Sequence, residues 1–408
     1  MRGMTTQFTV GERIAWYRRR RGLSQEVLAG RVGRTADWVS KIENGRIELD
    51  RLSVLRLLAD ALDVTLADLI AEPSLMEWTR DSGQATVPAL RSVLMDYRPI
   101  TASVNGDEVA DDGITLDELR DDLHDLWAAY QEARFGYVVN RLSALIPAAR
   151  SAVRVRNGDE SRTASGRLAL AYHLAATQLT KLGEGDLAWT ASNRGMEAAQ
   201  NSENPVVIGS LLRSLAHSLA STGEYAPAVR VVQDAVGFLE PHMGKAGRTL
   251  TSVYGTALLA GSMAAARADD RATVREFLCE ADRAAARLGG DRNHLWTAFG
   301  PTNVAIHRVA TAMELGDVQT ALALGPDLDT STVPVERRVR HALEVARAQS
   351  SANHRDDALA TLMDAEQVAP EQVRYHYLSR HLVQTWIRTQ RGKPSFHLAG
   401  LAERLRIA

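Results

Sequence analysis

The feature that most constrains the fold of this chain is a turn that recurs five times between residues 182 and 358. In each copy a small or turn residue lies five positions before a second small residue, and 37 to 48 residues separate successive copies. From Thr115 onward the chain carries almost no strand signal, so this pattern predicts stacked helical hairpins. The five pairs are Gly183 with Ala188, Gly223 with Ala228, Ala268 with Thr273, Gly316 with Ala321, and Asn353 with Ala358.

These hairpins resemble tetratricopeptide-like repeats, whose ideal period is about 34 residues. The longer intervals here indicate degenerate repeats with longer helices or loops. The resemblance implies an α-solenoid over residues 115–408, in which stacked hairpins bury a continuous core and leave a concave inner face. We expect this array to supply the contacts of a homodimer and to bind a signal.

A shorter stretch, residues 21–46, has the pattern of two short helices joined by a tight turn. Ser24 and Thr35 are suited to cap helix N-termini, and Gly33 between them tolerates the backbone angles of a turn. Asn44-Gly45 is suited to end the second helix in a left-handed C-cap. The residues predicted to face inward are Val27, Leu28, Val32, Val39 and Ile42. The second helix then presents a polar outer face with basic ends, sized for a DNA major groove.

The run from Gly22-Leu23-Ser24-Gln25-Glu26 to Val39-Ser40-Lys41-Ile42-Glu43-Asn44-Gly45-Arg46 resembles the helix-turn-helix of the Xre (phage-repressor-like) regulators. The resemblance implies an all-α, five-helix DNA-binding domain over residues 1–72. Its first helix would begin after Thr9, its fourth would span 52–62 and its fifth 65–69. It also implies that Arg18 pairs internally with Glu43 and does not contact DNA.

The same resemblance assigns the DNA contacts. Ala36 could touch only a thymine methyl, Asp37 could accept from a cytosine amino group, and Lys41 could donate to guanine. For Trp38, packing against the neighbouring helix and contact with the sugar-phosphate backbone both stay open. The residues expected to contact phosphate are Arg19, Arg20, Arg21, Gln25, Arg34, Thr35, Ser40, Asn44 and Arg46. Arg19, Arg20 and Arg21 could alternatively form a solvated helix end.

One such domain buries only about 600–1,000 Å² on DNA, so we expect a homodimer on a palindromic operator of double-stranded DNA. Charge agrees with this placement, because residues 1–51 hold 11 Lys and Arg against 6 Asp and Glu although the whole chain has a net charge of −2. Residues 73–114 form a predicted linker with one helix over 87–97. Nine Asp and Glu lie within residues 107–125. They form either a solvated face or a segment that restrains the basic domain.

Several classes of protein are disfavoured by the composition. The chain has one cysteine, Cys279, which excludes a disulfide framework, and no run of about 18 apolar residues. It also lacks a glycine-rich phosphate loop, a nucleophile elbow and a His-Glu-x-x-His metal motif. We therefore expect a cytoplasmic protein that is not an enzyme, contacts no membrane, and needs no cofactor or metal.

Polar and aromatic residues on the first helix of each hairpin are candidates for ligand binding, because those helices line the concave face. Asn303 shares a face with His307 at a spacing of four, and Arg213 likewise with His217. The full candidate set is His173, Arg213, His217, Tyr254, Trp296, Phe299, Asn303 and His307. Each of them alone could equally be a core residue. The basic cluster Arg337, Arg338, Arg340 and His341 is either solvated or receives an acidic group.

The motif Phe299-x-Pro301-Thr302-Asn303-Val304-x-x-His307 resembles one found in a set of actinobacterial regulators. The combination of an Xre-type head with the array also resembles the peptide-sensing quorum regulators. These resemblances imply a DNA-binding transcriptional regulator whose array senses a peptide or small-molecule effector. Two alternatives stay open: a protein-interaction adaptor tethered to DNA, and a constitutive repressor that uses its repeats only to dimerise.

Overall fold

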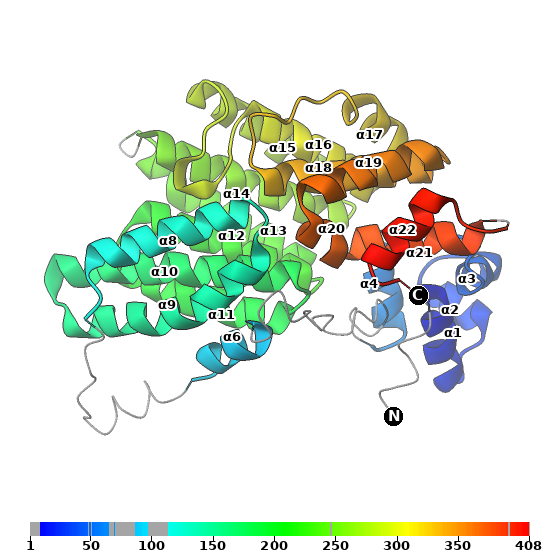
Figure 1. Cartoon of the computed structure of the whole chain (residues 1–408), viewed down its shortest axis with the longest axis horizontal. Coiled ribbons are helices and arrows are strands. Elements are labelled where there is room, and N and C mark those ends of the chain that lie inside the picture. Colours follow the sequence, from blue (N-terminus) through cyan, green and yellow to red (C-terminus); the bar gives the residue numbers. More distant parts are fainter. Residues whose placement is uncertain are drawn as a thin grey trace.

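A computed structural model of the chain describes residues 9–47, 49, 51–64, 69, 86–96, 113–244, 247–390 and 392–407. Among these residues the fold is all-α, and the only β pairing is one isolated bridge between Arg292 and Phe299. A small N-terminal body, blue in Figure 1, lies beside a much larger stack of helices. None of the described helices is long and apolar enough to cross a membrane.

The N-terminal body contains four described helices, and polar side chains set where three of them begin. Thr9 forms a capping box with Glu12. The Ser24 and Thr35 hydroxyls accept backbone N–H groups at 3.1 and 3.2 Å. The predicted caps are therefore confirmed, and Gly33 and Gly45 have the expected positive φ angles of +62° and +66°. The helices are α1 (Val10–Arg20), α2 (Gln25–Arg31), α3 (Ala36–Glu43) and α4 (Leu52–Ala61).

The core of this body agrees with the predicted inward face except at one residue. Leu28, Val32, Val39 and Ile42 are all buried. The prediction for Val27 is wrong, because its side chain is 47% exposed. Leu28 and Val32 are four residues apart and share the inward face, and Val27 is rotated by about 100° from Leu28 on a helix of 3.6 residues per turn. The predicted fifth helix lies outside the described residues except for Leu69, which is buried.

Little of the predicted linker, residues 73–114, is described. Its predicted helix is α6 (Thr86–Leu94), which packs on α9 through Val87, Leu90 and Leu94. Most of the acidic stretch before Gly113 lies outside the described residues. From Thr115 the array begins with a second capping box, in which Thr115 and Glu118 cap α8.

The array is a succession of helical hairpins, each packed on the next (Figure 1), and it curves so that α18 contacts α8. Its helices are α8 (Leu116–Gln131), α9 (Phe135–Val155), α10 (Gly158–Lys181), α11 (Gly185–Ser202), α12 (Pro205–Ser221), α13 (Tyr225–Leu239), η2 (Glu240–His242), α14 (Gly247–Arg267), α15 (Arg271–Leu288), η3 (His294–Trp296), α16 (Pro301–Leu315), α17 (Val318–Leu324), α18 (Val335–Ser351), α19 (Arg355–Val368), α20 (Pro370–Tyr375), α21 (Tyr377–Thr389) and α22 (Phe396–Arg404).

All five predicted turns fall between the two helices of a hairpin, which confirms the α-solenoid. Gly183, Gly223 and Gly316 have φ angles of +74°, +87° and +79°, in the region that favours glycine. In the third hairpin the turn lies one residue later in the chain than predicted. There Asp269 has the positive φ angle, and Val274, five positions later, is buried.

A further hairpin, α8 with α9, has the same turn but was not predicted. Ala133 has a φ angle of +62°, and Val138, five positions later, is fully buried. Because alanine and valine stand where three of the other copies have glycine and alanine, composition alone does not mark this turn. The geometry of the turn is therefore more regular than its sequence.

The N-terminal body docks on the array through α4. The Arg56 Nη1 donates to the Thr222 carbonyl at 2.5 Å, and its Nη2 lies 3.6 Å from the Glu224 carboxylate. Thr222 and Glu224 belong to the turn between α12 and α13. The Arg51 guanidinium occupies the space beside Gly316, in the turn between α16 and α17. The start of α4 and its first turns thus pack against two hairpin turns of the array.

Candidate functional site

The outer face of α3 carries the residues predicted to read bases. Asp37 and Lys41, one helical turn apart, form an ion pair of 2.7 Å, and their side chains are 70% and 44% exposed. Ala36 precedes them and is half-buried. In the structure the two charged side chains therefore neutralise each other. A base-edge hydrogen bond from Lys41 would exchange its carboxylate partner for a guanine.

Most of the side chains predicted to contact phosphate are exposed. Arg19, Arg20, Arg34, Thr35, Asn44 and Arg46 are exposed, whereas Ser40 is half-buried. The Arg20 and Arg34 guanidinium groups lie over the rings of Trp16 and Trp38, 5.0 and 5.6 Å from the ring centroids. The Asn44 amide donates to the Ser40 carbonyl at 2.7 Å. Trp38 packs against the core of the head, as one of its two interpretations expected.

Two more of the predicted phosphate residues, Arg21 and Gln25, have partners within the head. Arg21 donates from Nη1 to the Asp63 carboxylate at 2.8 Å and from Nη2 to the Asp63 carbonyl at 2.6 Å, which ties the end of α1 to the end of α4. The Gln25 amide donates to the Glu43 carboxylate at 2.8 Å. Their roles on DNA stay predictions, since each contact would have to be shared or exchanged with a phosphate.

The predicted pair between Arg18 and Glu43 is confirmed. Arg18 donates from Nε and Nη2 to the two Glu43 oxygens at 2.5 and 2.8 Å, and from Nη1 to the Leu23 carbonyl at 2.7 Å. Burial raises the pKa of Glu43, but hydrogen bonds from Arg18 and Gln25 outweigh it and hold that pKa below its ordinary value. This bidentate pair joins α1 to α3, and Gln25 adds α2 to it.

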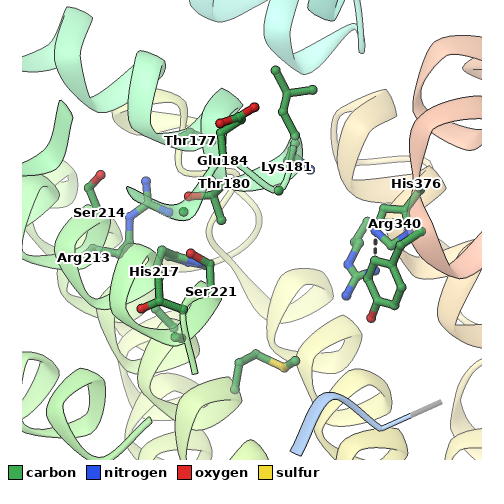
Figure 2. Close-up of a pocket in the computed structure, with 18 of the residues that line it drawn as sticks. Thr177, Thr180, Lys181, Glu184, Arg213, Ser214, His217, Ser221, Arg340 and His376 are labelled. Atoms are coloured by element: carbon green, nitrogen blue, oxygen red, sulfur yellow. Dashed lines mark hydrogen bonds between the residues drawn. The ribbon is translucent and has the colours of Figure 1, made fainter. Parts of the chain in front are cut away.

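A cavity of about 910 Å³ lies at the centre of the array. It is lined mainly by the first helices of five hairpins (α8, α10, α12, α14 and α16), by α18 and by the start of α21, and its rim includes Arg56, Asp60 and Val64 of the head. Of the predicted ligand-binding residues, the structure brings five to its wall: His173, Arg213, His217, Trp296 and His307. Figure 2 shows Arg213 and His217 on one side of the cavity and Arg340 with His376 on the other.

The other three candidates lie outside the lining. The ring of Phe299 is fully buried against Gly255, where a side chain at residue 255 would overlap it. Tyr254 is buried beside it on α14, with its hydroxyl 3.4 Å from Glu280. Asn303 is buried, and its carbonyl accepts from His307 Nδ1 at 2.8 Å. The cavity reaches α16 only from Ile306 onward, so a shared helix face did not suffice to place Asn303 in it.

Several lining residues were missed by the sequence analysis. Lys181 and Arg267 are the last residues of α10 and α14, immediately before predicted turns. A search of the helix ends before each turn would have found both. His376 does not stand out in the sequence, but it lines the cavity and its Nε2 accepts from Arg340 Nη1 at 2.9 Å. No local signal marks Tyr377, which follows it and also lines the cavity.

Histidines in the cavity are neutral at pH 7. Burial, reinforced by Arg213 and other cations, lowers the pKa of His173 and His217 well below the ordinary value. Burial and Arg337 lower the pKa of His307 to about 3. The charge of the cavity therefore comes from its lysine, arginine, aspartate and glutamate side chains. Within the described part of the chain, no group of three His, Cys, Asp or Glu side chains is placed to hold a metal ion.

Comparison with known proteins accounts for the head. A family model described as a helix-turn-helix domain matches residues 9–72. The N-terminal body is a helix-turn-helix domain. A domain of this kind implies DNA binding. No curated protein matches the chain.

Two solved structures resemble the helical stack at low sequence identity. BtubC (BKLC) from P. vanneervenii is 16% identical with a TM-score of 0.38, over 62% of this chain and 95% of that chain. Aspartyl phosphate phosphatase F from Bacillus subtilis is 13% identical with a TM-score of 0.41, over 90% of this chain and 96% of that chain. At these scores neither likeness carries an argument about function.

Proposed function

We propose that this chain is an Xre-type, ligand-responsive transcriptional regulator and not an enzyme. Two copies bind a palindromic operator through α3, and a peptide or small molecule in the cavity of the array changes the affinity for that operator. The observation that carries the proposal is the position of Arg56. This residue of the head lines the rim of the cavity and binds the turn that ends α12.

The helix α12 links the wall of the cavity to the head. It carries Arg213 and His217, and it ends at Thr222, whose carbonyl accepts from Arg56. The α4 residues Leu55 and Leu58 belong to the same buried cluster as Val39 of α3. A shift of α12 on ligand binding would therefore move α4 together with the recognition helix.

A ligand changes operator affinity only if it binds one arrangement of head and array better than the other. In a homodimer, a small rotation of each head changes the distance between two recognition helices. Half-sites of a palindrome lie about 34 Å apart on one face of the duplex, so such a change alters the fit to DNA. The array is the part large enough to hold two copies together.

The proposal is tested by selecting binding sites from random duplex DNA with the full-length protein. Affinity for the selected site is then measured in buffer and in peptide or metabolite fractions of cell extract. We expect a palindromic site whose affinity changes in at least one fraction. Failure to select any site at moderate salt would refute DNA binding. Equal affinity in every fraction would favour the constitutive repressor, and a stoichiometric protein partner without a metabolite response would favour the adaptor.

A further inference from the structure

Within the proposed function, and resting on it, the structure also indicates the class of ligand. We propose that the cavity binds a small organic anion with a flat apolar body, and that its acidic group binds Arg213. Three observations carry this inference: the charges that face the cavity, the cation that has no described carboxylate partner, and the aromatic wall beside that cation.

The interior of the cavity has more positive than negative side chains. Apart from residues of the head, the lining carboxylates that are buried or half-buried are Glu184, Glu336 and Glu344, and the half-buried cations are Lys181, Arg213, Arg267, Arg337 and Arg340. All three carboxylates are paired. Glu184 lies 3.0 Å from Arg91, Glu336 contacts Lys181 and lies 3.6 Å from Arg337, and Glu344 lies 2.8 Å from Arg340. Among the buried and half-buried side chains that the structure describes, the lining therefore offers no free carboxylate to a cationic ligand.

Arg213 is the exception among these cations. Arg267 lies 3.7 Å from the buried Glu314, and the other three have the carboxylate partners just described. Among the described residues, no carboxylate lies within 4.0 Å of Arg213, whose hydrogen-bond partner is the His173 Nε2 at 2.9 Å. Removing an unpaired charge from water is costly, so an anion that reaches this guanidinium gains a strong, charge-assisted hydrogen bond.

The histidine beside Arg213 does not replace a carboxylate. Burial and the charge of Arg213 lower the pKa of His173 well below its ordinary value, so the ring is neutral and accepts from the guanidinium. Burial also lowers the pKa of Arg213 to about 10, which leaves the guanidinium charged at pH 7. The site therefore presents one full positive charge that no described carboxylate neutralises.

An aromatic wall lies next to this charge. The rings of Trp127 and Trp296 stack with their centroids 5.3 Å apart and 6° between their planes. His173 meets Trp127 edge-on at 5.1 Å, so the same imidazole contacts both the wall and Arg213. A cavity of about 910 Å³ lies within the usual range for small organic ligands. A flat apolar body against the tryptophans would thus carry its acidic group to Arg213.

The test uses two fluorescent probes that differ mainly in charge. 1-Anilinonaphthalene-8-sulfonate is an anion with a flat apolar body, and N-phenyl-1-naphthylamine has the same body without the sulfonate. We expect the anion to bind the full chain at one site. Arg213→Gln should weaken anion binding at least tenfold and change binding of the neutral probe less than twofold. Equal effects on the two probes, or no effect on the anion, would overturn the proposal.

Arg230→Gln is the matched control. It removes one arginine charge from the exposed surface of α13, outside the cavity lining, and should leave the affinity for both probes unchanged. Arg213→Lys keeps the charge and should retain most of the anion binding. If Arg213→Gln does not fold, the comparison of Arg213→Lys with the unaltered chain still decides, since a large loss with Lys contradicts a role for charge.

Competition on the unaltered chain distinguishes the acidic groups. 1-Naphthoate and 1-naphthyl phosphate are expected to displace the sulfonate probe, and the stronger of the two identifies the acid as carboxylate or phosphate. 1-Naphthalenemethanol, which has no charge, should not displace it. Displacement by the alcohol as readily as by the acids, or only by an acidic peptide, would overturn a small organic anion.

Operator binding is measured separately on the same protein. A chain that binds the anion through Arg213 but selects no DNA refutes the proposed function and leaves the ligand class standing. A chain that binds DNA and responds to extract, but binds the sulfonate probe independently of Arg213, refutes the ligand class alone.

Discussion

The surface of the head that is predicted to face DNA and the cavity of the array are both rich in arginine, but burial gives those arginines different properties. On the head Arg20 and Arg34 are exposed and lie over tryptophan rings, and Lys41 pairs with Asp37 at the surface. Such pairs contribute only about 0–1 kcal/mol and open readily to meet a phosphate or a base. In the cavity, four of the five interior cations are held by buried carboxylates and Arg213 is held by His173, so a ligand meets a charge arrangement that is already set.

The head also contains a buried ion pair, Arg18 with Glu43. Arg18→Ala should leave Glu43 buried without its partner and destabilise the head by about 3–5 kcal/mol, the cost typical of breaking a buried pair. We expect this variant to lose more DNA binding than any change at an exposed arginine of the head. Urea unfolding followed by tryptophan fluorescence measures the loss of stability, with the exposed Arg20→Ala as control. Similar urea midpoints of unfolding for both variants would show that the buried Arg18 contributes no more to stability than the exposed Arg20.

Arg56→Ala tests whether the two regions communicate. The variant removes the contacts of α4 with Thr222 and Glu224. Allosteric coupling is typically about 1–3 kcal/mol, or a 5- to 150-fold change in affinity. We expect most of the ligand-induced change in operator affinity to disappear, as measured by titration with and without ligand. Arg141→Ala, which breaks a 3.4 Å pair with Asp122 outside the cavity lining, should keep the coupling. Loss of coupling in both variants would contradict a specific role for α4.

Within the head, we expect different residues to determine sequence specificity and overall affinity for DNA. Lys41→Ala is expected to cost about 1–3 kcal/mol at one base pair of the selected operator and to relax preference there. Arg46→Ala should weaken binding to all sequences alike and lower the slope of log affinity against log salt by about 1. Affinities for single-base variants of the operator at several salt concentrations test both. A uniform effect of Lys41→Ala would show that it contacts phosphate.

The last prediction concerns the buried histidines. The pKa of His307 is about 3 in the folded chain against an ordinary 6.5, so the unfolded chain binds a proton more readily. Stability should therefore fall as the pH decreases from about 6.5 towards 3. His307→Gln should lessen this decline, seen as a smaller drop in melting temperature between pH 7 and 4. The exposed His397→Gln should leave the decline unchanged. Equal slopes for both variants would contradict the burial argument.

Much of the fold could be predicted because its signals are local. A cap such as Thr35 acts on a backbone group three residues away, and a glycine such as Gly223 is needed where its own φ angle is positive. These interactions leave fixed spacings in the chain. Where the same turn is built from other residues, as at Ala133, the spacing remains but the composition that marks it is lost.

The cavity could be predicted only in part. Placement on a first helix brought Arg213 and His217 to the wall, but the same rule also selected Tyr254 and Phe299, which lie in the core. A first helix has one side towards the concave face and another towards the next hairpin. Which side a residue occupies depends on how each helix rotates as it packs, and no spacing within one helix records that rotation.

The amino-acid sequence by itself determined the two kinds of domain, their order, the caps and turns, and the pair between Arg18 and Glu43 that follows from the family resemblance. Each of these depends on residues close in the chain or on a short pattern of set spacing. The tertiary structure alone decided that His376 faces Arg340, that Arg56 holds the end of α12, and that Arg213 has no carboxylate partner among the described residues. Such contacts join helices far apart in the chain, and only their packing brings the side chains within reach.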